Sequence, residues 1–289
     1  MAQSRPTTWF ITGASSGFGH AFASYALAQG YNVVATARNP AKLAELSAQA
    51  PHRVLALSLD VDQPGAADKA VKEAVARFGG IDVVINNAGY SIVGSVEETP
   101  EKELRALMET NFFGAVAVTR AALPTLRAQG SGAIVNISSL GGQLSYPGFG
   151  AYSASKFALE GMSEALALEV APFGIKVMIV EPGNFRTNLL GGGTRAMPSM
   201  PEYQATVGGT REFAKQMHGS QLGDPLKAAA AIELALKSAS TPLRLQLGDD
   251  AVAAVRDHAR KLLADLERWE SVAVDTKLEG ATSSAKPLS

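Results

Sequence analysis

Short apolar runs rich in β-branched residues recur along this 289-residue chain, and segments of helical periodicity separate them. Strands that alternate with helices form a parallel sheet, because each crossover returns the chain to the same edge. The runs are nearly continuously apolar, as expected where helices cover both faces of the sheet. We therefore predict a doubly wound α/β fold with a seven-stranded parallel sheet, its strands lying in TTWFITG, YNVVATAR, RVLALSLDV, IDVVINNAG, GAIVNISS, IKVMIVEPG and LRLQLG.

The composition is that of an ordinary soluble globular protein, with 46% hydrophobic residues, 18% charged residues and a formal net charge of -1. This balance offers no basic surface for nucleic acid or an anionic membrane, so we expect neither as a partner. The absence of cysteine excludes disulfides and thiol nucleophiles. The four histidines lack metal-ligand spacing, so we expect no metal. Neither a signal peptide nor a membrane span is visible, which predicts a cytoplasmic protein.

We expect residues 1–289 to form a single domain with two additions. The stretch 188–223 is rich in glycine and interrupted by prolines, and it follows a strand end, which favours a movable substrate-binding lid over an irregular insertion. The C-terminal extension 249–289 begins with an amphipathic helix that would serve packing or an interface, and it ends in a loose tail.

A glycine-rich loop, TGASSGFG at residues 12–19, directly follows the first strand and opens a helix. Its backbone N–H groups and the helix N-terminus could hold a pyrophosphate, as in a Rossmann fold, while a second glycine allows close backbone approach. The alternative is that the glycines only close a turn. We predict dinucleotide binding by Gly13, Ser15, Ser16, Gly17, Phe18 and Gly19.

The choice of nucleotide depends on the end of the second strand, VVATARNP. A carboxylate there favours the ribose 2′-hydroxyl of NAD, whereas arginine favours the 2′-phosphate of NADP. The stretch contains Ala37 and Arg38 and no carboxylate, so NADP(H) is expected and NAD(H) is the less favoured nucleotide. Arg38 could instead be an ordinary surface residue.

Several motifs in one order make the chain similar to the classical short-chain dehydrogenases/reductases from about residue 7 to residue 187. The resemblance rests on the glycine loop, Asp60–Val61, NNAG at 86–89, Asn111, two serines at 138–139, YSASK at 152–156 and PGNFRT at 182–187. It implies that the adenine lies by Asp60 and Val61, and that the rest of the nucleotide is contacted by Asn87, Ala88, Gly89, Tyr152, Lys156, Pro182, Gly183, Phe185 and Thr187. It also implies the catalytic set Asn111, Ser139, Tyr152 and Lys156, with Ser139 preferred over Ser138 because family members place the serine thirteen residues before the tyrosine.

Tyr152 and Lys156 are one helical turn apart, so both side chains can reach the same cleft. A phenol with a pKa of about 10 exchanges its proton poorly near neutral pH, and a nearby ammonium would lower that pKa. Tyr152 could then exchange a proton with a substrate oxygen held by Ser139. By the family resemblance, Asn111 would anchor a water and a proton path through Lys156. Such a pair also occurs on ordinary helix surfaces, and only the company of the other motifs favours catalysis.

These features together predict an NADP(H)-dependent oxidoreductase acting on a carbonyl or secondary alcohol, with reduction the favoured direction. The substrate would be a hydrophobic small molecule, although the apolar residues of the lid could equally be core: Leu189, Leu190, Met197, Met200, Tyr203 and Phe213. A nucleotide sensor without turnover and an isomerase or dehydratase remain as alternatives. The family resemblance implies a homodimer or homotetramer, formed through the helices that carry Asn111 and Tyr152.

Overall fold

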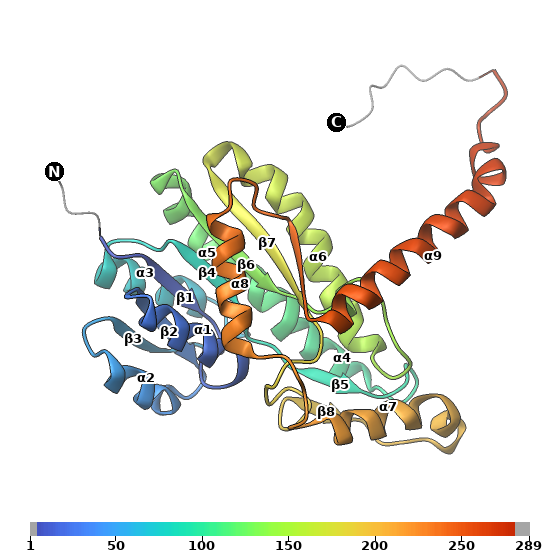
Figure 1. Cartoon of the computed structure of the whole chain (residues 1–289), viewed down its shortest axis with the longest axis horizontal. Coiled ribbons are helices and arrows are strands. Elements are labelled where there is room, and N and C mark those ends of the chain that lie inside the picture. Colours follow the sequence, from blue (N-terminus) through green and yellow to red (C-terminus); the bar gives the residue numbers. More distant parts are fainter. Residues whose placement is uncertain (1–4, 281–289) are drawn as a thin grey trace.

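The computed structural model describes residues 5–280 and contains the predicted seven-stranded parallel sheet (Figure 1). The strand order is β3-β2-β1-β4-β6-β7-β9, so the chain moves first to one side of β1 and then to the other. The fold prediction is therefore confirmed. The strands are β1 (Thr8–Ile11), β2 (Asn32–Ala37), β3 (Val54–Ser58), β4 (Val83–Asn86), β6 (Gly132–Ile137), β7 (Ile175–Pro182) and β9 (Arg244–Leu247).

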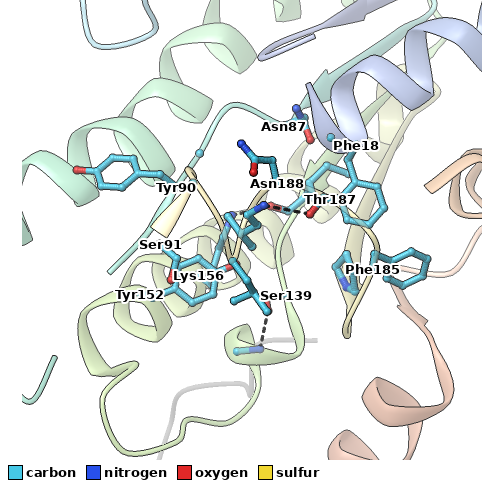
Figure 2. Close-up of a pocket in the computed structure, with 18 of the residues that line it drawn as sticks. Phe18, Asn87, Tyr90, Ser91, Ser139, Tyr152, Lys156, Phe185, Thr187 and Asn188 are labelled. Atoms are coloured by element: carbon cyan, nitrogen blue, oxygen red, sulfur yellow. Dashed lines mark hydrogen bonds between the residues drawn. The ribbon is translucent and has the colours of Figure 1, made fainter. Parts of the chain in front are cut away.

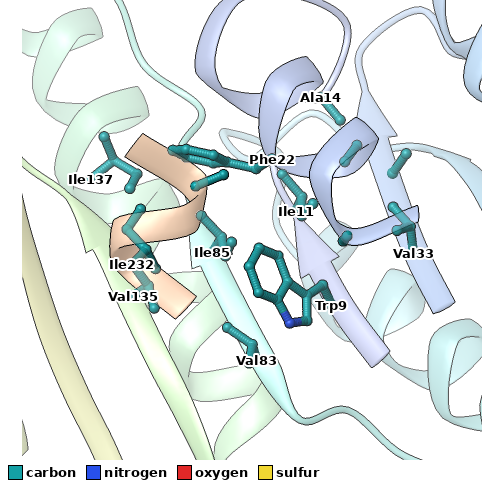
Figure 3. Packing of buried hydrophobic residues seen from close by; sticks show 14 of the residues in the cluster. Trp9, Ile11, Ala14, Phe22, Val33, Val83, Ile85, Val135, Ile137 and Ile232 are labelled. Carbon is teal, nitrogen blue, oxygen red and sulfur yellow. The ribbon is translucent and has the colours of Figure 1, made fainter. Parts of the chain in front are cut away.

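Helices cover both faces of the sheet, which explains why the strands are apolar on both sides. Successive strand residues point to opposite faces, so Trp9 and Ile11 join one core cluster while Phe10 joins the other. The first cluster packs under α1 (Gly17–Ala28), α2 (Ala44–Gln49) and α8 (Pro225–Lys237), as Figure 3 shows around Trp9, Phe22 and Ile232. The second lies under α3 (Ala66–Phe78), α5 (Gly114–Gln129) and α6 (Gly150–Val170).

The helix caps follow local sequence signals. Gly30 adopts a left-handed φ of 82° after the end of α1, a conformation in which a glycine commonly ends a helix. At the start of α8, the Asp224 carboxylate accepts a hydrogen bond from the main-chain N–H of Leu226, and Pro225 occupies the first turn. These cap signals define where α1 ends and where α8 begins.

The helix that follows Pro100 has one irregularity. It begins as α4 (Glu101–Met108), passes through a π-helical turn at Glu109–Phe113, and continues as α5. A π-turn holds one residue more than an α-turn and is frequent at functional sites. Here it contains Asn111, which is buried.

The stretch 188–223 is more regular than its composition suggested. It contains β8 (Thr194–Ala196), which pairs in parallel with β5 (Ser91–Val93), and the 14-residue helix α7 (Gln204–Met217). The glycines at 208 and 209 concealed this helix, although it buries Val207 and Ala214. The alternative of an irregular insertion therefore does not describe this stretch, and its role as a movable lid stays a prediction.

The predicted C-terminal helix is present as α9 (Asp249–Val274) and projects away from the sheet (Figure 1). Its base is attached because Asp250 accepts hydrogen bonds from the main chain and the side chain of Asn184, in the loop after β7. The end of the expected tail, residues 281–289, lies outside the described residues. Among the helices of residues 5–280, none has the length and apolarity needed to cross a bilayer.

Candidate active site

A cavity of about 1080 Å³ opens at the carboxyl ends of the parallel strands. This is the edge where open α/β sheets bind ligands, next to the point between β1 and β4 at which the strand order reverses. The loops after β1, β2, β3, β4, β6 and β7 all contribute to its wall. Every predicted site residue lines this cavity except Gly19 and Asn111, which lie behind its wall.

The glycine loop is held against β4 by a small hydrogen-bond network. The Thr12 hydroxyl accepts from the main-chain N–H groups of Asn87 and Ala88, each at 2.9 Å, and the Asn87 amide donates to the carbonyl of Thr12 at 2.8 Å. Gly13 has a left-handed φ of 67°, and a Cβ at Gly19 would overlap the carbonyl oxygen of Gly13. Gly19 therefore acts by allowing the helix to approach the loop, without facing the cavity.

The start of α1 has the form of a phosphate cradle. Ser16 caps this helix without a side-chain hydrogen bond to it, so the first N–H groups are available to an anion. Gly17 has a left-handed φ of 53°. A Cβ at this position would lie 3.3 Å from the Cβ of Thr187, and it would narrow the gap that a diphosphate would occupy. Since no acidic side chain occupies the first turn, these residues fit a nicotinamide dinucleotide.

The sequence reasoning missed a second cation near the adenosine end. Lys42 lines the cavity together with Ala37 and Arg38, because the turn Pro40–Leu43 folds back after β2. Asn39 sets this turn by accepting a hydrogen bond from the N–H of Ala41 at 3.0 Å. The signal was present in RNPAK, where an asparagine-proline turn separates two cations.

The expected catalytic side chains come together at the end of β6 and the first turns of α6 (Figure 2). Lys156 is buried, donates from Nζ to the carbonyl of Ile137 at 2.8 Å, and lies 5.7 Å from the ring centroid of Tyr152. The Ser139 hydroxyl accepts from the N–H of Gly141 at 3.0 Å, which fixes its position on the cavity wall. Ser138 also lines the cavity, but it is buried and its hydroxyl donates to Glu160 at 2.6 Å, whereas the Ser139 hydroxyl is hydrogen-bonded with Tyr152.

The ionisation of this pair differs from the expectation. Burial raises the pKa of Tyr152 to about 12, and a hydrogen bond with Ser139 opposes that rise only in part. Burial also lowers the pKa of Lys156 to about 8, against the attraction of Glu160. The prediction of a lowered tyrosine pKa is therefore wrong for the nucleotide-free protein, because desolvation of the buried phenol is the dominant effect.

The side chain of Asn111 forms hydrogen bonds within the protein. Its amide nitrogen donates to the carbonyl of Tyr90 at 2.9 Å and to the hydroxyl of Ser155 at 3.0 Å, while its oxygen accepts from the N–H of Tyr90 at 3.0 Å. Ser155 in turn donates to the carbonyl of Tyr152 at 2.7 Å. Asn111 thus connects the loop after β4 to the helix that carries the tyrosine.

A buried ionic network behind the serine loop was not anticipated. Glu160 accepts from Ser138 at 2.6 Å and from Arg244 at 3.0 Å, and Glu181 lies 3.3 Å from the same guanidinium. Burial raises the pKa of Glu181 to about 7. Its members come from β7, β9 and α6, which are far apart in sequence, so no local pattern could reveal it.

The apolar residues of 188–223 separate into two groups. Leu189, Leu190 and Phe213 line the cavity, whereas Met197 is buried with Ile92 and Leu107 in a small core cluster. Met200 and Tyr203 attach the segment to the body: the Met200 N–H donates to Glu98, and the Tyr203 hydroxyl donates to Glu97.

Acidic and histidine side chains do not cluster in threes as a metal site would require anywhere in residues 5–280.

Comparison with known proteins agrees with this geometry. The model of the short chain dehydrogenase family matches residues 7–197, so the chain belongs to that family of oxidoreductases. A protein of Botryotinia fuckeliana, described as oxidoreductase BOA17, is 42% identical over 267 residues, covering 92% of this chain and 97% of its own length.

Solved structures extend the comparison to the fold. A short-chain dehydrogenase from Streptomyces avermitilis has a TM-score of 0.89 and 51% identity, with 94% of this chain and all of that one covered. An archaeal alcohol dehydrogenase from Thermococcus sibiricus, complexed with 5-hydroxy-NADP, has a TM-score of 0.68 and 25% identity, covering 83% and 95%. Solved neighbours thus hold a form of NADP or NADH, and this chain is an NAD(P)-binding oxidoreductase by family.

Proposed function

We propose that this protein reduces a hydrophobic ketone or aldehyde with NADPH, and that it oxidises the corresponding alcohol in reverse. The observation that carries the proposal is the junction of β6 and α6, where Ser139, Tyr152 and Lys156 share one wall of a cavity built for a dinucleotide. A buried lysine beside a tyrosine and a serine hydroxyl suits proton exchange with a substrate oxygen.

The nucleotide would lie across the carboxyl ends of the strands. The first turn of α1 would receive the diphosphate, and Asp60 and Val61 would border the adenine. Asn87, Ala88 and Gly89 would flank the middle of the nucleotide. Pro182, Gly183, Phe185 and Thr187 would enclose the nicotinamide, and the ring of Phe18 packs tilted against that of Phe185 at 5.1 Å between centroids.

Preference for NADPH follows from charge at the adenosine end. Arg38 and Lys42 both line the cavity after β2, and two cations would neutralise most of the charge of a 2′-phosphate. Ala37 presents no carboxylate to a ribose 2′-hydroxyl, which removes the feature that NAD-binding sites of this fold use.

When bound, the reduced nicotinamide supplies the hydride, and the chain's own residues handle the proton. Ser139 would hold the substrate oxygen by a hydrogen bond, and Tyr152 would donate its phenolic proton to that oxygen. With a pKa of about 12, Tyr152 is protonated at neutral pH, as a proton donor must be. The Lys156 ammonium would stabilise the phenolate that remains, and it would hydrogen-bond the nicotinamide ribose.

Reprotonation of Tyr152 requires a path to solvent. The side-chain amide of Asn111 already donates hydrogen bonds to Tyr90 and Ser155. We therefore propose that the water of this proton path binds a main-chain carbonyl of the π-helical turn, and not the Asn111 amide. Asn111 would then position this path, while Lys156 would pass the proton to the tyrosine.

The substrate would lie between Tyr152 and the segment 188–223, which we propose to be a lid in one Rossmann-type domain. Leu189, Leu190 and Phe213 provide an apolar wall, and Tyr146 and Phe149 add aromatic surface opposite. A hydrophobic carbonyl compound fits such a lining better than a polar one.

We also propose that the protein is a homodimer or homotetramer through α5 and α6. The π-helical turn before α5 exposes Phe113 at 50%, and α6 exposes Phe157 at 48% and Leu168 at 80%. A subunit contact would cover these large apolar side chains.

The deciding experiment follows nicotinamide absorbance while the protein meets a panel of aldehydes, aliphatic ketones, aryl ketones, quinones and steroid ketones. We expect NADPH oxidation with at least one hydrophobic ketone, and a loss of about 10²–10⁴ in kcat for Tyr152→Phe. NADPH affinity of this variant, measured by fluorescence titration, should stay within a few-fold of the parent. Tight NADPH binding without turnover of any compound would favour the sensor instead, and product formation without net cofactor consumption would favour an isomerase or dehydratase.

A further inference from the structure

The outer part of α9 lies in solvent although it carries many large apolar side chains. Every residue from 259 to 274 is exposed, including Leu262 at 58%, Leu266 at 62% and Trp269 at 60%. Figure 1 shows the helix pointing away from the sheet, with contact only at its base. A free helix of this length is marginal in water, and a continuous apolar stripe on a surface marks an interaction site.

The apolar residues of α9 follow a coiled-coil spacing. They recur at alternating intervals of three and four, which is the 3.5-residue repeat of a helix pair: Val252, Val255, Ala259, Leu262, Leu266, Trp269 and Ala273. Val255 is half-buried at the base, so the free part is the group Ala259, Leu262, Leu266 and Trp269, which we name the α9 seam. We propose that the α9 seam pairs antiparallel with the α9 seam of a second copy of this chain.

Side-chain size supports a copy of the same helix as the occupant. In an antiparallel pair centred between residues 262 and 266, Leu262 meets the partner's Leu266. In the same register Ala259 meets the partner's Trp269, so the smallest residue of the seam faces the largest. Because the two-fold axis repeats both contacts, one sequence supplies both halves of a matched surface.

Charge beside the seam selects the antiparallel direction. In this register Arg256 lies opposite the partner's Glu270, and symmetry makes this ion pair twice. A parallel pair would instead place Asp265 beside the partner's Glu270, which is a like-charge contact made twice. The antiparallel pair makes only one like-charge contact, between Asp265 and the partner's Asp265. Within each helix, the Asp265 carboxylate lies 3.6 Å from the Arg268 guanidinium of that helix.

This contact differs from the proposed one through α5 and α6, and it leaves the cavity residues unchanged. The seam covers about three helical turns, so its association should depend on protein concentration. If both contacts form, removing the seam should halve the number of copies in the assembly without abolishing it.

Sedimentation velocity at several protein concentrations tests the seam by substitution. Leu262→Asp combined with Leu266→Asp should halve the assembly mass, because each α9 helix of the pair would have to bury two carboxylates in the contact. The matched control, Ala264→Asp combined with Ser271→Asp, adds the same charge to the opposite face and should leave the mass unchanged. Circular dichroism and NADPH oxidation of each variant show whether the domain is intact. An unchanged mass in the seam variant overturns the proposal.

Cross-linking tests the direction, because the chain contains no cysteine and each introduced thiol is unique. With a short bis-maleimide, Leu263→Cys should form a covalent dimer on a denaturing gel, since it lies next to the two-fold axis. Arg256→Cys and Glu270→Cys should each stay monomeric alone and form a dimer when mixed. Capture of Arg256→Cys with itself would mean parallel pairing, and no capture of Leu263→Cys would mean another occupant. Either result overturns the proposal, whatever the activity.

Discussion

At the residue scale, the proposed preference for NADPH depends on two side chains, Arg38 and Lys42. Arg38→Ala should weaken NADPH binding about 10- to 100-fold, as expected when one charge-assisted hydrogen bond of about 1.5–3 kcal/mol is removed. NADH binding should change little, since NADH lacks the 2′-phosphate. Lys42→Ala should have a smaller effect of the same sign. Fluorescence titration with both nucleotides gives the comparison, and an equal loss for NADPH and NADH would contradict the 2′-phosphate role.

A second residue-scale prediction concerns pH. Burial lowers the pKa of Lys156 to about 8, so the ammonium is present below that pH and is lost above it. The value of kcat/KM for NADPH reports groups of the free enzyme, and it should therefore fall as pH rises through about 8. Since a guanidinium stays protonated, Lys156→Arg should abolish this alkaline limb at whatever activity remains. A limb near pH 10 in the parent would mean that Lys156 is not desolvated in solution.

At the element scale, one carboxylate attaches the proposed lid to the body of the domain. Glu98 is buried and accepts hydrogen bonds from the N–H groups of Ser95 and Met200, each at 2.7 Å, and from Arg211 of α7 at 2.8 Å. The two main-chain donors and Arg211 lower the pKa of Glu98 to about 2. Because the folded-state pKa is lowered, the ionised Glu98 carboxylate stabilises the folded protein. This stabilisation is complete above the ordinary carboxyl pKa, and it is lost as pH falls toward 2.

Removing this charge should loosen the lid alone. In Glu98→Gln, amide hydrogen exchange should accelerate across 194–217, and KM for the carbonyl substrate should rise more than kcat falls. Strands β1 and β4 should exchange at the parent rate. Glu97→Gln is the matched control. Glu97 accepts one exposed hydrogen bond, from the Tyr203 hydroxyl of the same segment, so this variant should change exchange rates and KM little. Faster exchange throughout the sheet would mean that Glu98 stabilises the whole domain.

At the scale of the whole molecule, nucleotide binding should appear as thermal stability. A ligand at about 100 times its Kd stabilises the native state by about 2.7 kcal/mol, which for a chain of this size raises Tm by about 5–10 °C. At equal concentration NADPH should give the larger shift and NADH the smaller one. Differential scanning fluorimetry makes this comparison without any substrate, and a larger shift with NADH would reverse the assigned preference.

The sequence by itself determined the parallel sheet, the glycine loop and the pairing of Tyr152 with Lys156. These features depend on short-range pattern: strand hydrophobicity, the conformational freedom of Gly13, and the four-residue spacing that puts two side chains on one helix face. Local pattern also predicted α9, though not its exposure.

Only the tertiary structure decided the features that depend on distance between remote segments. It brought Lys42 to the cavity, used the Asn111 amide for Tyr90 and Ser155, and formed α7 despite its glycines. It also reversed the expected shift of the Tyr152 pKa, because the degree of burial sets the desolvation cost of a charge. Spacing along the chain identifies which groups can meet, whereas their ionisation and hydrogen-bond partners depend on everything that packs around them.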